Sequence, residues 1–266
     1  MSEYKHLLVS EADGIVTVQL NRPDARNALN DVLMRELTEF ARAYRTKPSV
    51  RAIILRGGES NFSAGADLNT SFEGRRAARP SLLELRESVM SGPDMCKAWE
   101  DIEAVTIVAI EGYCVGGACA LAASCDFRIV GGGAQLRLPE VPLGINMSWR
   151  SIPRLVGLMG PSRAKRFVMF GEMTNAETCV DWGLADELAP KGEAYAQAQV
   201  WARKVAALPP LPVRMTKEAV NATAAANHHA TSFMDRDQFL LTFASKDFEE
   251  GVKAFFEKRP PNFKGD

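Results

Sequence analysis

The chain has 266 residues, of which 46% are hydrophobic, and it carries 32 Lys and Arg against 33 Asp and Glu. A chain of this length and composition can bury a substantial core, so disorder is not expected. Its net charge of −1 supplies no field that would capture nucleic acid or an anionic membrane, and neither is an expected partner.

The five cysteines and three histidines point away from disulfide and metal chemistry. No CxxC pair occurs, the number of cysteines is odd, and the histidines lack metal-ligand spacing. We therefore expect reduced core cysteines, a cytoplasmic location and no metal site. The N-terminal residues show no secretory signal, and the longest uncharged span, 112–125, is too short and too glycine-rich to cross a bilayer.

The predicted elements of the first 190 residues alternate between strands and helices. Alternating apolar residues predict a strand over 14–20, and a turn over 21–27 follows it. Apolar residues at three- and four-residue spacing then predict an amphipathic helix from Asn30 to before Pro48. Further strands are predicted near 50–56, 105–110, 126–130 and 184–188. This alternation predicts an α/β fold with a mainly parallel sheet covered by helices.

Beyond Pro190 the pattern predicts only helices, over 194–207, 213–226, 233–243 and 247–258. Six side chains give these helices more apolar surface than solvated helices need; they are Phe239, Leu240, Phe243, Phe248, Phe255 and Phe256. We therefore divide the chain into a core of 1–190, for substrate binding and catalysis, and a helical region of 191–266, for packing or oligomerisation.

Two glycine-bearing turns carry the main functional signal. Gly116 and Gly117 follow an apolar strand and open an uncharged helix, and NFSAGADL at 61–68 follows the strand near 50–56. Two such turns can aim two backbone N–H groups at one oxygen, and donors of this kind contribute about 2.7–4 kcal/mol each when a carbonyl becomes an oxyanion. The turns predict an enzyme acting at a carbonyl, with ordinary tight connections as the alternative. The segment 73–80 is predicted to be a mobile loop over the first turn.

Seven motifs occur in order from about Asp13 to Phe263: NRPDARNAL, FSAGADL, EGYCVGGACALAASCD, LPEVPLG, GPSRAK, WGLADE and AFFEKRPPNF. On these motifs the chain resembles the enoyl-CoA hydratase/isomerase (crotonase) superfamily. The resemblance implies a spiral of repeated ββα units with a C-terminal helical trimerisation region, assembled as a homotrimer or homohexamer. It also implies an acyl-CoA thioester substrate, with coenzyme A present as part of the substrate and no further cofactor.

The same resemblance assigns binding roles by position. The backbone N–H groups of Ala66 and Gly117 form the implied oxyanion hole. Six residues are implied at coenzyme A: Arg26, Ala64, Asp67, Leu68, Phe255 and Lys258. Of these, the Ala64 carbonyl is expected at the adenine amino group and Arg26 near the phosphates, while Phe255 and Lys258 are expected to reach the coenzyme A of a neighbouring subunit. The alternatives are solvated charge for the two basic side chains and interface packing for Phe255.

Glu140 in LPEVPLG is the predicted catalytic residue. An extended segment delivers it beside an apolar stretch, where burial would raise the pKa of its carboxyl and suit it to proton transfer. By position it matches the family's second catalytic glutamate. Hydratases of the family carry another glutamate three residues after the oxyanion glycine, where this chain has Ala120.

One carboxylate can move a single proton from the carbon next to the thioester to another carbon, which favours enoyl-CoA double-bond isomerisation. Enoyl-CoA hydration is the first alternative, and a noncatalytic acyl-CoA-binding paralogue or thioester hydrolysis are the others. Four acidic residues are candidates for a second carboxylate, although a turn cap or a solvated charge is the expected role of each: Asp67, Glu73, Glu84 and Glu87. Met147 and Trp149 stand where the family often has small residues, and they are predicted to narrow the acyl pocket, with buried structure as the alternative for Trp149.

Overall fold

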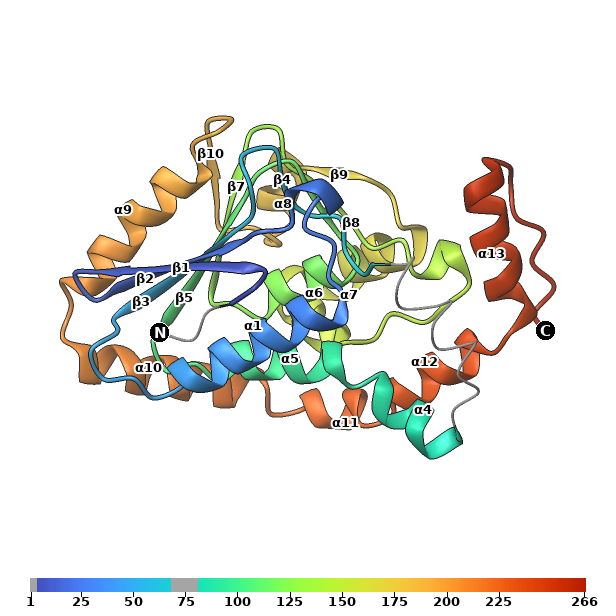
Figure 1. Ribbon diagram of the computed structural model, residues 1–266, viewed down its shortest axis with the longest axis horizontal. Coiled ribbons are helices and arrows are strands. Elements are labelled where there is room, and N and C mark those ends of the chain that lie inside the picture. The colour runs from blue at the N-terminus through green and yellow to red at the C-terminus, as the bar shows by residue number, and fades with distance from the viewer. Residues whose placement is uncertain (1–3, 68–80) are drawn as a thin grey trace.

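The computed structural model describes residues 4–67 and 81–266 (Figure 1). Leu68 and the loop predicted at 73–80 lie outside the described residues.

A six-stranded sheet with the order β1-β2-β3-β5-β7-β10 forms the centre of the fold. The strands are β1 (Leu7–Ala12), β2 (Ile15–Leu20), β3 (Ala52–Arg56), β5 (Val105–Ile110), β7 (Phe127–Gly131) and β10 (Glu187–Ala189). The first two strands pair antiparallel and all later pairs are parallel. The predicted, mainly parallel sheet is therefore confirmed, with β1 as an edge strand that the sequence pattern did not indicate.

The central strand β5 shows why the sheet is covered on both faces. All six of its residues are buried. Val108 and Ile110 face one apolar cluster, and Ile107 and Ala109 face the other. Residues of a strand alternate between faces, so an unbroken apolar run requires an apolar layer on each side.

A second, four-stranded sheet has the order β4-β6-β8-β9. Its strands are β4 (Asn61–Ser63), β6 (Tyr113–Val115), β8 (Gln135–Arg137) and β9 (Thr174–Asn175). Three times in succession, the chain forms a strand of the large sheet, then a strand of the small sheet, and then helical structure. The three pairs of strands are β3 and β4, β5 and β6, and β7 and β8. These three segments are the repeated ββα units, and they bring the turns after β4 and β6 to the same edge.

Helices cover both sheets (Figure 1). They are α1 (Asp31–Tyr44), α4 (Leu82–Ser88), α5 (Ser91–Glu100), α6 (Gly117–Ala123), α7 (Ser151–Phe170), α8 (Ala176–Asp181), α9 (Ala194–Ala206), α10 (Pro210–Ala224), α11 (His228–Ser232), α12 (Asp235–Phe243) and α13 (Lys246–Glu257), with short 3₁₀ turns η1 (Pro23–Ala25) and η2 (Val141–Leu143). The predicted helix after Asn30 is confirmed, and the Asn30 side chain caps it by accepting the Leu33 N–H at 2.9 Å.

The C-terminal region is helical, as predicted. Helix α9 packs on the large sheet through Ala194, Ala198 and Ala202, whose small side chains allow close approach. Helix α10 starts at Pro210 rather than at 213, because proline is compatible with the first turn of a helix. The use of 191–266 as an oligomerisation region stays a prediction.

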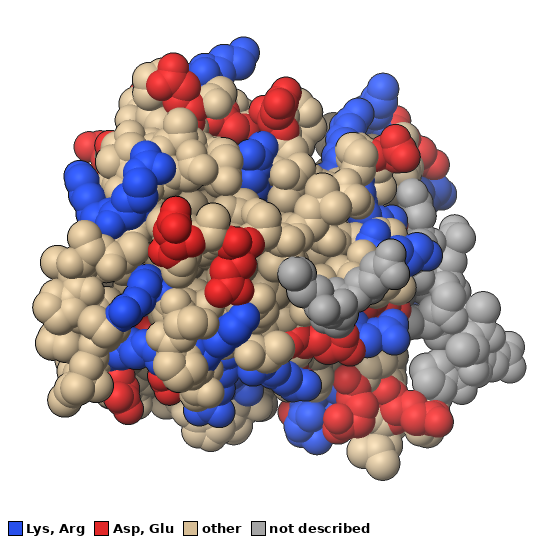
Figure 2. Space-filling view, turned by 60° about the vertical axis from the view of Figure 1, so that its left-hand side comes forward, with Lys and Arg blue, Asp and Glu red and all other residues tan. Residues whose placement is uncertain are grey.

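Positive and negative side chains are interspersed on the face of the molecule in Figure 2. None of the helices in the described part of the chain is long and apolar enough to cross a membrane.

Candidate active site

A cavity of about 210 Å³ lies where the turns after β4 and β6 meet the segment that follows β8. Its wall includes Ala66, Gly117 and Glu140, together with Met147 and Trp149. Helices α12 and α13 contribute Phe239 and Phe255. The fold thus collects at one cavity residues that are distant in the sequence.

Glu140 follows β8 and precedes η2, and its Oε2 atom is buried without a hydrogen-bond partner among the described residues. Burial raises the pKa of Glu140 to about 7, against weaker lowering effects of a backbone hydrogen bond and of Arg137. Near neutral pH the carboxyl group therefore populates both protonation states, so it can accept a proton and return it.

Gly116 makes room for this carboxyl group. A Cβ atom at this position would lie 2.7 Å from Glu140 Oε1, and the backbone has a φ of 56°, which disfavours other residues. The glycine turn that the sequence singled out therefore also shapes the space around the acid.

The two predicted donor turns pack backbone against backbone. Gly65 has a φ of 86°, and a Cβ there would lie 2.4 Å from the Val115 carbonyl oxygen. This contact leaves no space for a side chain between the turns and brings Ala66 and Gly117 to the same cavity.

The N–H groups of Ala66 and Gly117 have no acceptor among the described residues. Beside Ala66, Leu29 donates its N–H to the Gly65 carbonyl at 2.8 Å and accepts the Asp67 N–H at 3.1 Å, so the Ala66 N–H faces away from Leu29. Gly117 is the first residue of α6, where N–H groups have no partner inside the helix.

Trp149 lies between two glycines of different helices. A Cβ on Gly92 of α5 would lie 2.1 Å from the indole, and a Cβ on Gly117 of α6 would lie 2.3 Å from it. Trp149 and Arg150 both have left-handed backbones, with φ of 63° and 56°, which for non-glycine residues costs about 1–3 kcal/mol each. Gly92 was not identified from the sequence, where an isolated glycine near the start of a helix carries no such signal.

Glu140 supplies the only carboxylate on the cavity wall among the described residues. Ala120 is buried in α6. Of the other candidates, Asp67 pairs with Arg22 at 3.2 Å, Glu84 forms a capping box with Ser81, and Glu87 pairs with Arg236 at 3.5 Å. Glu73 lies outside the described residues. Within the described ranges there is also no group of three or more His, Cys, Asp or Glu side chains that could hold a metal ion.

A family model described as Enoyl-CoA hydratase/isomerase matches residues 10–266. The chain belongs to the enoyl-CoA hydratase/isomerase family. It is 32% identical to a crotonyl-CoA hydratase of Syntrophomonas wolfei over 261 residues, 98% of each chain. It is 33% identical to a 2,3-dehydroadipyl-CoA hydratase of Escherichia coli over 259 residues, 97% of this chain and 98% of the relative.

Solved structures of this family superpose along the whole chain. An enoyl-CoA hydratase/isomerase from Pseudoalteromonas atlantica has a TM-score of 0.86 at 26% identity, and an enoyl-CoA hydratase from Bacillus anthracis has a TM-score of 0.77 at 31% identity. Each comparison covers 98% of this chain and 100% of the other. The predicted crotonase-like fold is confirmed, and the chain is an enzyme of the hydratase/isomerase family, whose members act on coenzyme A thioesters.

Of the residues that the family resemblance assigns to coenzyme A, Ala64 and Phe255 line the cavity, and Leu68 lies outside the described residues. Ala64 is exposed and lines the cavity, and its N–H donates to the carbonyl of the exposed Arg26 at 3.0 Å. Phe255 is 55% exposed and lines the cavity of its own chain. Its expected contact with the coenzyme A of a neighbouring subunit stays a prediction. The exposed Lys258 follows it at the end of α13. The roles of these residues stay predictions.

Proposed function

We propose that this enzyme shifts the double bond of an enoyl-CoA thioester through an enolate, with Glu140 as the single proton carrier. The observation that carries the proposal is the combination, in one cavity, of two N–H groups without acceptors and one carboxyl group whose pKa is raised to about 7.

In the proposed reaction, the thioester carbonyl oxygen accepts hydrogen bonds from the N–H groups of Ala66 and Gly117. The Glu140 carboxylate removes a proton from carbon 2 of a 3-enoyl thioester, and the electron pair of that C–H bond delocalises onto the carbonyl oxygen as a dienolate. Glu140 then returns the same proton to carbon 4, which yields the 2-enoyl thioester. Preorganised donors stabilise such an oxyanion by about 2.7–4 kcal/mol each, and a positioned acid–base group accelerates proton transfer about 10²–10⁴-fold.

The coenzyme A part of the substrate is proposed to lie along the cavity mouth. Ala64 offers its carbonyl to the adenine amino group, Arg26 and Lys258 neutralise phosphates, and Phe255 contributes an exposed apolar ring. All four residues are exposed, and Ala64 and Phe255 line the cavity, which supports this arrangement. Asp67 and Leu68 are the other two residues that we propose to contact coenzyme A.

Enoyl-CoA hydration is the second candidate, because relatives that are 32% and 33% identical to this chain are named hydratases. In that reaction Glu140 alone would both activate water and return a proton to carbon 2. The absence of a carboxylate at position 120 is the reason that we favour isomerisation.

We also propose that the enzyme is cytoplasmic and assembles as a homotrimer or homohexamer. Exposed apolar side chains on α10 support an assembled state, among them Leu211, Met215 and Val220. Light scattering on the purified chain is expected to give a mass that is a multiple of three protomers.

The function is tested by assaying the purified enzyme on 2-enoyl-CoA and 3-enoyl-CoA thioesters, with Glu140→Gln as the decisive variant. We expect turnover of the 3-enoyl substrate and weak hydration of the 2-enoyl substrate. Glu140→Gln should lower turnover about 10³-fold while leaving the Kd for a saturated acyl-CoA unchanged. Glu39→Gln, an exposed position on α1, is the matched control and should retain full activity.

Two outcomes contradict the proposal. Strong hydration that survives Glu140→Gln would exclude Glu140 as the proton carrier. Tight acyl-CoA binding without turnover of any thioester would show a noncatalytic binding protein instead.

A further inference from the structure

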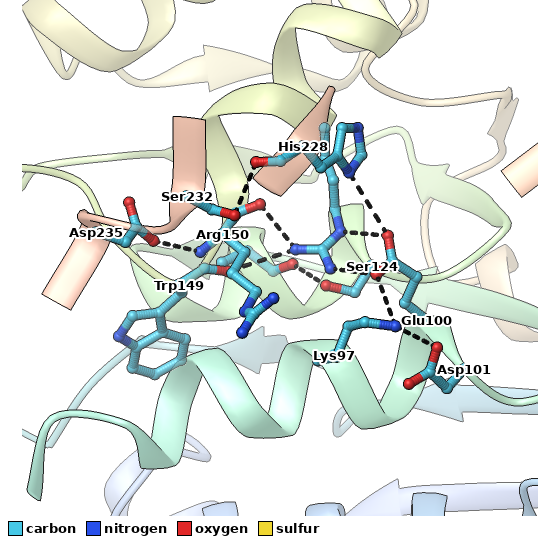
Figure 3. Close-up of polar contacts among 11 residues, drawn as sticks. Lys97, Glu100, Asp101, Ser124, Trp149, Arg150, His228, Ser232 and Asp235 are labelled. Atoms are coloured by element: carbon cyan, nitrogen blue, oxygen red, sulfur yellow. Dashed lines mark hydrogen bonds and ion pairs between the residues drawn. The ribbon is translucent and has the colours of Figure 1, made fainter. Parts of the chain in front are cut away.

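The turn that carries Trp149 is held from both sides by buried polar groups. Asp235, the first residue of α12, accepts the N–H of Arg150 at 2.7 Å (Figure 3). The same carboxylate oxygen lies 3.4 Å from the Ser148 hydroxyl. Asp235 is only 7% exposed, and burial raises its pKa, while the hydrogen bond from Arg150 acts in the opposite direction.

Arg154 of α7 holds the carbonyl side of the same turn. Its guanidinium donates to the Arg150 carbonyl at 2.8 Å and to the Trp149 carbonyl at 3.5 Å. Glu100 at the end of α5 fixes the guanidinium through two hydrogen bonds of 3.1 and 2.9 Å. Both backbone groups of Arg150 are thus occupied, which accounts for two consecutive left-handed residues that are rare outside glycine.

The indole points away from this polar network (Figure 3). It fills the space between Gly92 and Gly117, where neither glycine could carry a Cβ atom. It therefore closes the cavity beside one of the two proposed oxyanion donors. The remaining cavity of about 210 Å³ lies below the range of about 300–1,000 Å³ typical of small-molecule pockets.

We propose that Trp149 is a fixed wall that restricts the substrate to short acyl chains, and that Asp235 and Arg154 are the positioning residues that hold this wall in place. The inference rests on the proposed function, because it assumes that an acyl-CoA binds in this cavity. The turn that carries the indole is held by residues of α5, α7 and α12, so the indole cannot move aside without breaking buried hydrogen bonds. A longer acyl chain would therefore collide with the indole rather than displace it.

The test measures binding, by calorimetry, of butyryl-CoA and octanoyl-CoA, two saturated thioesters that need no turnover. The unmodified enzyme should bind butyryl-CoA more tightly. Trp149→Gly removes the indole and suits a backbone with positive φ, so octanoyl-CoA should bind about ten-fold more tightly or better, since each buried methylene adds affinity. Phe170→Ala, which removes an exposed ring outside the cavity, is the control and should leave the ratio of the two Kd values unchanged.

Asp235 is tested as a positioning residue by two variants. Asp235→Ala removes the acceptor of the Arg150 N–H and should reduce discrimination between the two thioesters. Asp235→Asn keeps an oxygen that can accept this N–H and should restore the discrimination of the unmodified enzyme. A role in stability alone would change the unfolding midpoint without changing the ratio of the two Kd values.

The results separate this inference from the proposed function. Equal discrimination in the unmodified enzyme and a folded Trp149→Gly variant would overturn the wall, even if isomerase activity is found. Discrimination that is lost in Trp149→Gly would support the wall, even if no thioester is turned over. If Asp235→Ala does not fold, the result for Trp149→Gly still decides the role of the indole. Reduced discrimination between the two thioesters by Asp235→Asn would exclude a role of Asp235 that depends only on accepting the Arg150 N–H.

Discussion

Glu140 and Glu100 are two largely buried glutamates whose carboxyl groups have pKa shifts in opposite directions. Burial acts to raise the pKa of both. At Glu140 the effect of burial exceeds the lowering effects of a backbone hydrogen bond and of Arg137, and the pKa rises to about 7. At Glu100 the charge and hydrogen bonds of Arg154, together with the charges of Lys97 and His228, outweigh the effect of burial, and the pKa falls below its usual range. The presence of a cationic partner therefore separates the carboxylate of Glu100, which joins two helices, from that of Glu140, which is proposed to exchange protons.

The largest effect is expected when the partner of Glu100 is removed. Arg154→Met leaves the largely buried Glu100 carboxylate with Lys97 and His228, at 3.7 and 3.8 Å, as its remaining basic partners in the described part of the chain. The free energy of unfolding, measured in urea near neutral pH, should fall by about 3 kcal/mol, the lower end of the range for a broken buried pair. Lys246→Met, which breaks the exposed pair with Asp266, is the control and should show no measurable change. If Arg154→Met and Lys246→Met had the same free energy of unfolding, Glu100 would not depend on a cationic partner, and the contrast with Glu140 would be wrong.

The second prediction is that Glu140 lowers stability at alkaline pH. A carboxyl whose pKa is raised on folding keeps its proton in the folded state, so its favourable contribution is complete below the unfolded pKa and is lost as pH rises through about 7. Glu140→Gln should therefore be more stable than the unmodified chain by about 3 kcal/mol at about pH 8, and equally stable at about pH 4. Urea unfolding at both pH values measures this, and a difference that does not depend on pH would exclude a raised pKa.

Gly116→Ala should disturb Glu140 directly. The added Cβ would meet Glu140 Oε1 at 2.7 Å in a backbone that disfavours alanine. We expect kcat/KM to fall about 100-fold, which corresponds to losing about 2.7 kcal/mol of transition-state stabilisation. Gly157→Ala is the control, because no atom lies within 4 Å of its Cβ position on α7; it should keep activity and gain about 0.5–1 kcal/mol of stability. Similar activity of the two variants would argue against close packing of Gly116 on the acid.

The smallest expected effect is the pH dependence of catalysis. In the proposed mechanism, proton abstraction requires the carboxylate form of Glu140, whose pKa is raised to about 7. Below this pH, kcat/KM should fall by about ten-fold per pH unit, which gives about one tenth of the maximum at pH 6. A rate profile of the 3-enoyl substrate between pH 5.5 and 8.5 measures it. A profile that is flat down to pH 5.5 would assign proton abstraction to another group.

Much of the large sheet was predictable because its elements have local periodicity. The strand over 14–20 and the helix after Asn30 were placed close to β2 and α1, since each is long enough to show a repeat. The predicted strand near 184–188 is displaced to Glu187–Ala189. The strands of the small sheet have two or three residues, too few for any period, and their pairing joins segments far apart in the chain.

Local sequence alone determined the alternation of strands and helices, the two glycine turns and a glutamate at the end of an extended segment. Each depends on backbone preferences or patterns within a few residues. Only the tertiary structure decided that Gly65 packs on Val115, that Trp149 lies between Gly92 and Gly117, and that Asp235 holds Arg150. These contacts join residues at least 32 positions apart, and their stability comes from burial and shared hydrogen bonds that exist only once the chain has folded.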